Sequence, residues 1–209
     1  MINDLEIQTF NLGNTTVYVA DNFFSNPDVI YKEFFSTLGP IWHPNLDVVE
    51  QSLNQIYFID RRKYITTSIK KNIDDIVKNL TGYNPSSNQI YTNETIFFDE
   101  PLNDWDNYYF NVHRDMGYNF IVYLNKDSEE CGTNLYDYDQ YDSLTNLLHY
   151  GAEHVHPWVA KSKIARMAHL KGKYNRMVLF DGKLFPHGMN IIKNKFTDKY
   201  RQNITSFYE

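Results

Sequence analysis

Two side chains of the kind that bind metal ions, His113 and Asp115, stand two positions apart after an aromatic and apolar stretch. If that stretch is a strand, positions i and i+2 point to the same face, so an imidazole nitrogen and a carboxylate oxygen can reach one ion. A third candidate ligand, His187, follows a second apolar stretch much later in the chain. Together these residues predict a metal site built from two histidines and one carboxylate.

The donor set indicates the chemistry. Two imidazoles and one carboxylate on one face of an ion leave three coordination positions open, which is the arrangement of Fe(II) in non-heme oxygenases. A bidentate keto acid and dioxygen require those open positions. An H-x-D triplet arises by chance in many proteins, and a histidine after a proline is usually a surface residue. The prediction therefore depends on finding all three ligands in order, between strand-like segments.

A cation in the last strand-like segment fits the same chemistry. Arg201 opens the stretch 201–207, and a guanidinium can bind a carboxylate through two parallel charge-assisted hydrogen bonds. An arginine at the start of a strand is often only a surface residue, and Lys195 or Lys199 could serve instead. In combination with the three metal ligands, we predict that Arg201 binds a carboxylate.

The elements that must position these residues fall into two groups. Residues 5–20 are predicted to be extended, and residues 27–38 and 61–80 to be helices. The second helix is indicated by isoleucine, valine and leucine at spacings of three and four, with Gly82 after them. From residue 89 onward the pattern changes to short strands between turn residues. The predicted strands are 89–98, 108–113, 119–124, 133–138, 164–170, 176–180 and 204–208.

Helices followed by a run of short strands predict an α+β fold rather than an alternating α/β sheet. The 209 residues suffice for one domain with a buried core. We expect that single domain, 1–209, to have N-terminal helical support in 1–88, packed on one face, and a jelly-roll core, a double-stranded β-helix, in 89–209. The stretch 140–162 fits neither pattern and is predicted to be a partly helical insertion between strands.

Composition narrows the setting and the partners. The net charge is −6 with no basic excess, so nucleic acid is not expected as a partner. The single cysteine, Cys131, leaves no intrachain disulfide, and the sequence shows neither the pattern of a signal peptide nor an apolar run of membrane length. We therefore expect a cytoplasmic protein without a membrane partner, in a host cytoplasm if a phage encodes it. The oligomeric state is left open.

Taken in order, the motifs resemble those of the 2-oxoglutarate/Fe(II) oxygenase superfamily, and within it the prolyl-hydroxylase-like branch with its uncharacterised bacterial and phage relatives. The resemblance covers residues 89–208, and residues 19–27 resemble the opening of prolyl-hydroxylase-like domains more loosely. The turn that usually reads G-G-T or G-G-E has a single glycine here. The matching pieces are His113-Arg114-Asp115, the strand Ile121-Val122-Tyr123-Leu124-Asn125, the turn Cys131-Gly132-Thr133, the strand from Asn175 to Asp181 with His187-Gly188, and Arg201.

This resemblance implies a reaction and its ligands. Fe(II) held by His113, Asp115 and His187 would bind 2-oxoglutarate through its keto acid end, while Arg201 and Tyr123 hold the far carboxylate. Oxidative decarboxylation to succinate would then drive hydroxylation of a substrate, with ascorbate as an accessory reductant. By analogy with prolyl hydroxylases, we expect a protein or peptide side chain as the substrate rather than a free small molecule.

The substrate would bind at the mouth of the site. We expect Arg114 and the tyrosine-rich run 136–141 to line this mouth, and the insertion 140–162 to act as a lid. Packing on the surface of a sheet explains the tyrosine-rich run equally well.

Two other functions fit parts of the sequence. His149, His154 and His156 could hold a metal as in a cupin that does not use 2-oxoglutarate, but the glutamate expected after them is missing. A jelly roll that binds ligands without catalysis would not need the three metal ligands, and none of them is missing.

Overall fold

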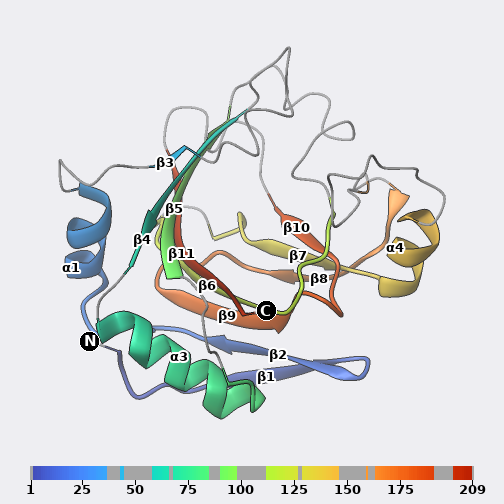
Figure 1. Cartoon of the computed structure of the whole chain (residues 1–209), viewed down its shortest axis with the longest axis horizontal. Coiled ribbons are helices and arrows are strands. Elements are labelled where there is room, and N and C mark those ends of the chain that lie inside the picture. Colours follow the sequence, from blue (N-terminus) through green and yellow to red (C-terminus); the bar gives the residue numbers. More distant parts are fainter. Residues whose placement is uncertain are drawn as a thin grey trace.

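The computed structural model describes residues 2–36, 43–44, 58–65, 68–84, 90–97, 112–126, 129–145, 159, 163–190 and 200–208. Within them the fold consists mostly of antiparallel strands with few helices (Figure 1). The strands are β1 (Gln8–Leu12), β2 (Thr15–Ala20), β3 (His43–Pro44), β4 (Phe58–Tyr64), β5 (Ile90–Phe97), β6 (Tyr118–Tyr123), β7 (Thr133–Tyr136), β8 (Arg166–Leu170), β9 (Arg176–Asp181), β10 (His187–Met189) and β11 (Arg201–Tyr208). The helices are α1 (Pro27–Tyr31), which continues as a π-helical turn (Lys32–Ser36), α3 (Ser68–Thr81) and α4 (Tyr138–Thr145).

The described strands form two sheets. The larger sheet has the order β1-β2-β9-β6-β11-β5-β4-β3, and the smaller has the order β10-β7-β8. An isolated bridge between His113 and His187 adds the segment 112–113 to the edge of the smaller sheet. The sheets lie against one another, and the hydroxyl groups of Tyr123 in β6 and Thr133 in β7 are 2.8 Å apart across them. This is a β-rich, jelly-roll-like architecture, as predicted.

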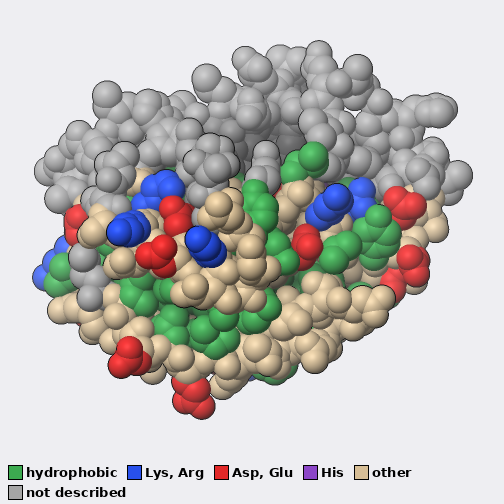
Figure 2. Space-filling model, turned by 60° about the horizontal axis from the view of Figure 1, so that its bottom comes forward, with side chains coloured by type: hydrophobic (Ala, Val, Ile, Leu, Met, Phe, Trp, Pro, Cys, Tyr) green, Lys and Arg blue, Asp and Glu red, His purple; other side chains and the backbone are tan. Residues whose placement is uncertain are grey.

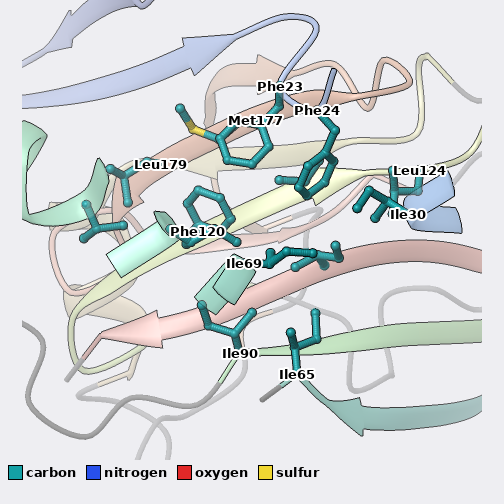
Figure 3. Packing of buried hydrophobic residues seen from close by; sticks show 14 of the residues in the cluster. Phe23, Phe24, Ile30, Ile65, Ile69, Ile90, Phe120, Leu124, Met177 and Leu179 are labelled. Atoms are coloured by element: carbon teal, nitrogen blue, oxygen red, sulfur yellow. The ribbon is translucent and has the colours of Figure 1, made fainter. Parts of the chain in front are cut away.

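The outer face of the larger sheet carries the main hydrophobic core (Figure 3). Apolar side chains at alternate positions of β6, β9 and β11 pack there against Ile69, Ile73 and Val77 of α3. Those three helix side chains are at most 1% exposed, and full burial of one such side chain stabilises a fold by about 1.5–3 kcal/mol. The helix therefore supports the larger sheet from the side that faces away from the smaller sheet.

The inner face of the larger sheet is more polar than its outer face. Because side chains alternate along a strand, Asn119 and Tyr123 of β6 point toward the smaller sheet, whereas Phe120 and Val122 point into the core beneath α3. Asn203 of β11 lies directly opposite Tyr123 and shares the inner face. A second buried apolar cluster, from β2, β6, β7, β9 and the turn before β10, lies between the sheets.

The predicted helix at 61–80 is wrong in its first part. Residues 58–64 form β4, which pairs with β5 along its whole length, and α3 begins only at Ser68. The apolar spacing did identify buried positions, because Ile65 and Ile69 are 3% and 1% exposed. Spacing alone could not reveal that β5 has an edge whose backbone groups need partners, and β4 supplies those partners.

Most of the other predicted elements are present. The extended stretch 5–20 is the β1–β2 hairpin, and β5, β6, β7, β8, β9 and β11 correspond to predicted strands. The predicted helix at 27–38 is α1 with its π-helical turn; its last two residues, like most of the predicted strand 108–113, lie outside the described residues. The strands β3, β4 and β10 were not predicted. Residues before 89 therefore form helices, as predicted, and also strands of the larger sheet.

The predicted insertion at 140–162 is only partly covered by the structure. Its start belongs to α4, which lies beside the smaller sheet and far from α3 in Figure 1. Val159 pairs with Val112, and most of the remaining positions lie outside the described residues.

On the face shown in Figure 2, basic and acidic side chains are interspersed. Among the helices that the structure describes, none has the length and apolar character needed to cross a membrane.

Asn175 fastens the N-terminal segment to the start of β9. Its φ of 60° lies in the left-handed region, which asparagine tolerates better than most residues. Its side chain accepts a hydrogen bond from the Phe24 nitrogen and donates one to the Phe24 oxygen, both at 2.9 Å. Its backbone carbonyl accepts a third bond from the Phe23 nitrogen at 2.9 Å.

We predict that Asn175→Ala lowers the free energy of unfolding by about 3 kcal/mol or more. Two buried backbone groups of Phe24 lose their partner at about 1–3 kcal/mol each, and alanine resists the left-handed conformation by about 1–2 kcal/mol. Asn175→Gly should cost less, because glycine adopts that conformation freely. Chemical denaturation measures the free energy of unfolding of both variants. An equal loss in the two variants would contradict a contribution from the left-handed backbone conformation at position 175.

Candidate metal centre

A short backbone bridge brings His113 and His187 together. The nitrogen of His113 donates to the carbonyl of His187 at 2.9 Å, and the nitrogen of His187 donates to the carbonyl of His113 at 2.7 Å. Residues directly opposite one another in an antiparallel pair place their side chains on the same face. The two imidazole rings consequently lie close together, with centroids 4.5 Å apart and planes at 52°.

Asp115 reaches the same place because the chain is tied there to the turn after β9. The amide of Asp115 donates to the carbonyl of Gly182 at 3.1 Å, and the amide of Gly182 donates to the carbonyl of Gly117 at 2.7 Å. A Cβ at Gly182 would lie 3.0 Å from Asn119 Nδ2 and 3.1 Å from Asp115 Cβ. The absence of a side chain at Gly182 therefore allows this close approach and fixes where the Asp115 side chain stands.

The three predicted ligands converge on one point. His187 Nε2 lies 3.0 Å from Asp115 Oδ2, His113 Nε2 lies 3.9 Å from Asp115 Oδ1, and one donor atom from each residue lies within 4.8 Å of the others. Two ligand atoms about 2.1 Å from one ion and at right angles stand about 3 Å apart. These separations fit a shared ion with small side-chain adjustments. Within the described ranges, no other group of three such side chains is arranged to hold a metal. Metal binding itself stays a prediction.

The ring of His187 is oriented for a ligand role. Its Nδ1 lies 2.9 Å from the carbonyl oxygen of Phe185, which can only accept a hydrogen bond, so Nδ1 carries the proton. In the neutral ring the lone pair is then on Nε2, the nitrogen that faces Asp115. The ring also packs edge-to-face against Phe180, with centroids 5.0 Å apart. A backbone carbonyl that fixes the tautomer and ring orientation is the usual partner of a metal-binding histidine.

The carboxyl group of Asp115 is held in its ionised form. Burial by itself would raise its pKa, but the charge and hydrogen bond that His187 supplies when protonated, the charge of a protonated His113 and the hydrogen bond from Asn119 outweigh it and hold the pKa well below its ordinary value. Because cations bind carboxylates and not carboxylic acids, Asp115 is ready to act as a ligand at neutral pH.

Arg201 and Tyr123 also meet on the inner face of the larger sheet. The Arg201 guanidinium carbon lies 5.7 Å from the centre of the Tyr123 ring, and the two residues are 5% and 2% exposed. Burial raises the pKa of the Tyr123 hydroxyl, although the charge of Arg201 and the hydrogen bond with Thr133 act in the opposite direction. The hydroxyl therefore stays protonated and can donate a hydrogen bond beside the guanidinium.

The glycine turn before Thr133 depends on close backbone approach. A Cβ at Gly132 would collide with the carbonyl oxygen of Leu170, and a Cβ at Gly172 would collide with the carbonyl oxygen of Cys131. The turn itself contains one glycine, Gly132. The second glycine at this point of the structure, Gly172, lies in the connection after β8. Thr133 is thereby held where its hydroxyl meets that of Tyr123.

One residue that touches two of the ligands was not predicted. Asn119 Nδ2 lies 2.6 Å from Asp115 Oδ2 and 2.8 Å from His187 Nε2, and the residue is 1% exposed. Its only signal in the sequence is an amide at an inward-facing position of an otherwise aromatic and apolar strand. Asparagine is frequent throughout this chain, so that signal does not distinguish Asn119 from its neighbours.

Arg114 does lie beside the tyrosine-rich run. Its guanidinium carbon is 5.0 Å from the centre of the Tyr138 ring and 5.5 Å from that of Tyr141, both in α4. The lid role of 140–162 stays a prediction. The other candidates lie outside the described residues: His149, His154 and His156 for a cupin-like site, and Lys195 and Lys199 for the carboxylate clamp.

No protein-family model matches the sequence, and neither does any curated protein. Among solved structures, the chain is similar to a prolyl-4-hydroxylase of Pseudomonas putida, with a TM-score of 0.45 and 8% identity, over 92% of this chain and 91% of that chain. It is also similar to the Fe(II)/α-ketoglutarate-dependent dioxygenase TqaL, with a TM-score of 0.36 and 11% identity, over 72% of this chain and 61% of that chain.

We predict that Gly182→Ala weakens metal binding about 10-fold or more, the usual effect of disturbing the surroundings of a metal ligand. The new methyl group would stand 3.0–3.1 Å from Asn119 Nδ2, the Gly117 carbonyl oxygen and Asp115 Cβ, so the tight approach of Asp115 to this turn must loosen. Calorimetric titration with Mn(II) measures the change. The matched control is Gly13→Ala: Gly13 has a φ of +60° and nothing within 4 Å of an added Cβ, so this variant should lose stability but keep its metal affinity. Equal metal affinity in both variants would contradict the role of Gly182.

Proposed function

We propose that the chain is an Fe(II)- and 2-oxoglutarate-dependent dioxygenase that hydroxylates its substrate. The observation that carries this proposal is the convergence of two imidazoles and one carboxylate, from His113, His187 and Asp115, on one point. Non-heme Fe(II) oxygenases use that donor set. Structural zinc sites are instead built from cysteine and histidine, and no cysteine takes part here.

The strand order supports a double-stranded β-helix as the finer description of the fold. Along the chain, β5, the segment 112–113, β6 and β7 alternate between the two sheets, and β8, β9, β10 and β11 alternate again. Four neighbouring strands of the larger sheet, β9-β6-β11-β5, thereby face 112–113, β10, β7 and β8 of the smaller. A jelly roll has eight strands in two such sheets. The candidate ligands come from 112–115 and β10, at one edge of the smaller sheet.

Bound Fe(II) would supply the activation of dioxygen, which amino-acid side chains cannot perform. The two imidazole nitrogens and the Asp115 carboxylate fit this ion in type and in separation. The chain's own contribution is to hold these groups: Phe185 fixes the tautomer of His187, and the ring of His187 is shielded, with only 7% of its side chain exposed.

Arg201 and Tyr123 would bind the far carboxylate of 2-oxoglutarate. A guanidinium offers a carboxylate two parallel hydrogen bonds, and the protonated Tyr123 hydroxyl offers a third. Both groups lie on the same face of the larger sheet as Asn119, which contacts the metal ligands. A dicarboxylate between these two places would have one end at the ion and the other at the arginine.

A protein or peptide side chain is the proposed substrate, with a free small molecule as the other candidate. Met116, next to Asp115, is 53% exposed, and Tyr138, in contact with Arg114, is 38% exposed. The surface beside the ligands thus combines apolar groups with a cation, a combination that suits a peptide chain.

Succinate release from 2-oxoglutarate in the presence of Fe(II) tests the proposal. We expect slow turnover without substrate, faster turnover with a peptide that is hydroxylated, and none in His187→Ala. If the parent protein binds neither Fe(II) nor 2-oxoglutarate, or releases no succinate with or without candidate peptides, the chain is a binding module and the proposal is wrong.

We predict that Arg201→Ala weakens 2-oxoglutarate binding by about 10²-fold or more. Two hydrogen bonds to a charged group, each about 1.5–3 kcal/mol, are lost, at about 1.4 kcal/mol per factor of ten. Arg201→Lys should recover only part of the loss, because an ammonium group lacks the planar fork. Titration of the Mn(II)-loaded protein with 2-oxoglutarate measures the affinities.

The matched control for this prediction is Arg176→Ala. Arg176 lies opposite Tyr123 in the neighbouring strand, but its Nε is bound to Asp21 Oδ1 at 2.6 Å. Its loss should reduce stability and leave the 2-oxoglutarate affinity within about twofold, since its guanidinium already has a carboxylate. A larger effect in Arg176→Ala than in Arg201→Ala would show that the wrong cation was assigned.

A further inference from the structure

The amide of Asn119 stands where a metal ligand would stand. Its Nδ2 is 2.6 Å from Asp115 Oδ2 and 2.8 Å from His187 Nε2, and those two atoms are 3.0 Å from one another. Three atoms at these separations have the spacing of neighbouring ligands around one ion, about 3 Å. An ion bound to both Asp115 and His187 is therefore in reach of the Asn119 side chain.

An amide nitrogen cannot coordinate a cation, because it has no available lone pair, and its N–H groups point their positive ends at the ion. The other end of the same amide, Oδ1, is buried and has no hydrogen-bond partner within the described part of the chain. Rotation of the amide by a half turn would thus break no bond at Oδ1 and would present an oxygen to the ion. The two N–H contacts that this rotation would break are made to Asp115 Oδ2 and His187 Nε2, the same atoms that would bind the ion.

We propose that Asn119 is a fourth protein ligand of the metal, through Oδ1, and that it turns between this role and its hydrogen bonds to Asp115 and His187. The inference rests on the proposed metal site at His113, Asp115 and His187. A facial triad leaves three positions open. The amide oxygen would take one of them and leave two for a bidentate keto acid. Binding of any further ligand would then require the amide to turn back, and this would be the role of Asn119.

Co(II) binding to three variants tests the proposal without recourse to activity. Asn119→Ala removes the oxygen, and Asn119→Asp replaces the amide with an isosteric group that has oxygen at both positions. We expect Asn119→Ala to bind Co(II) about 10-fold more weakly than the parent, and Asn119→Asp to bind it at least as tightly as the parent. Asn203→Ala is the matched control, because Asn203 is 2% exposed, lies on the same inner face and also has a buried Oδ1 without a partner in the described structure. It should bind Co(II) like the parent.

Thermal unfolding with Co(II) and with a chelator gives a second readout that does not require equal folding of the variants. Without metal, Asn119→Asp places two carboxylates side by side and should unfold at a lower temperature than the parent. With Co(II) the two carboxylates share the ion, so the metal-induced rise in Tm should be larger than in the parent.

The outcomes separate the two proposals. Loss of affinity in both Asn119→Ala and Asn119→Asp would show that Asn119 acts through its N–H groups and would overturn the inference. Unchanged affinity in Asn119→Ala would overturn it as well. In both cases the metal site itself would stand. If the parent protein fails to bind Co(II), the proposed function and the inference fall together.

Discussion

The site depends on two backbone hydrogen bonds between His113 and His187. They form an isolated bridge rather than part of a longer ladder, and a typical hydrogen bond contributes only about 1 kcal/mol net. The bridge is held because both of its flanks are fixed. On one side Val112 and Val159 exchange two backbone bonds of 2.9 and 2.8 Å, and on the other Asp115 is bound to the turn after β9. The three candidate ligands, from two distant segments, are thus brought together by a short backbone bridge that is fixed on both sides.

The strand β6 connects this site to the stability of the fold. Its outward residues Phe120 and Val122 are fully buried in the core under α3. On its inward side, Asn119 contacts the candidate metal ligands and Tyr123 contacts Arg201. A slip of one residue in the pairing of β6 would exchange the two faces, which would bury an amide in the apolar core and place an aromatic ring at the ligands. The hydrophobic core therefore fixes the register that the site requires.

The sequence predicted what local spacing can encode. The i, i+2 relation placed His113 and Asp115 on one face, and alternation identified most strands. Spacing did not separate β4 from α3, since the apolar residues that lead into a helix can equally end a strand. The short strand β10 was missed because it is a strand only through its pairing with β7 and with the segment 112–113, and its own sequence does not reveal that pairing. Asn119 was missed for a related reason: an asparagine becomes a contact of the ligands only once the sheets are assembled.

The inner face of β6 also sets the separation along the strand between the candidate metal ligands and Arg201. Asn119 and Tyr123 are four residues apart, which is about 13 Å along a strand. The five-carbon chain of 2-oxoglutarate extends over about 5–6 Å. In the proposed function, the side chains at the two ends, those of the candidate ligands beside Asn119 and of Arg201 beside Tyr123, would have to span the remaining length. In the proposed function, a keto acid with a single carboxylate would make no hydrogen bonds to the Arg201 guanidinium, which can bind a second carboxylate through two parallel bonds. The proposed function therefore requires a keto acid with a second carboxylate at the end far from the ion.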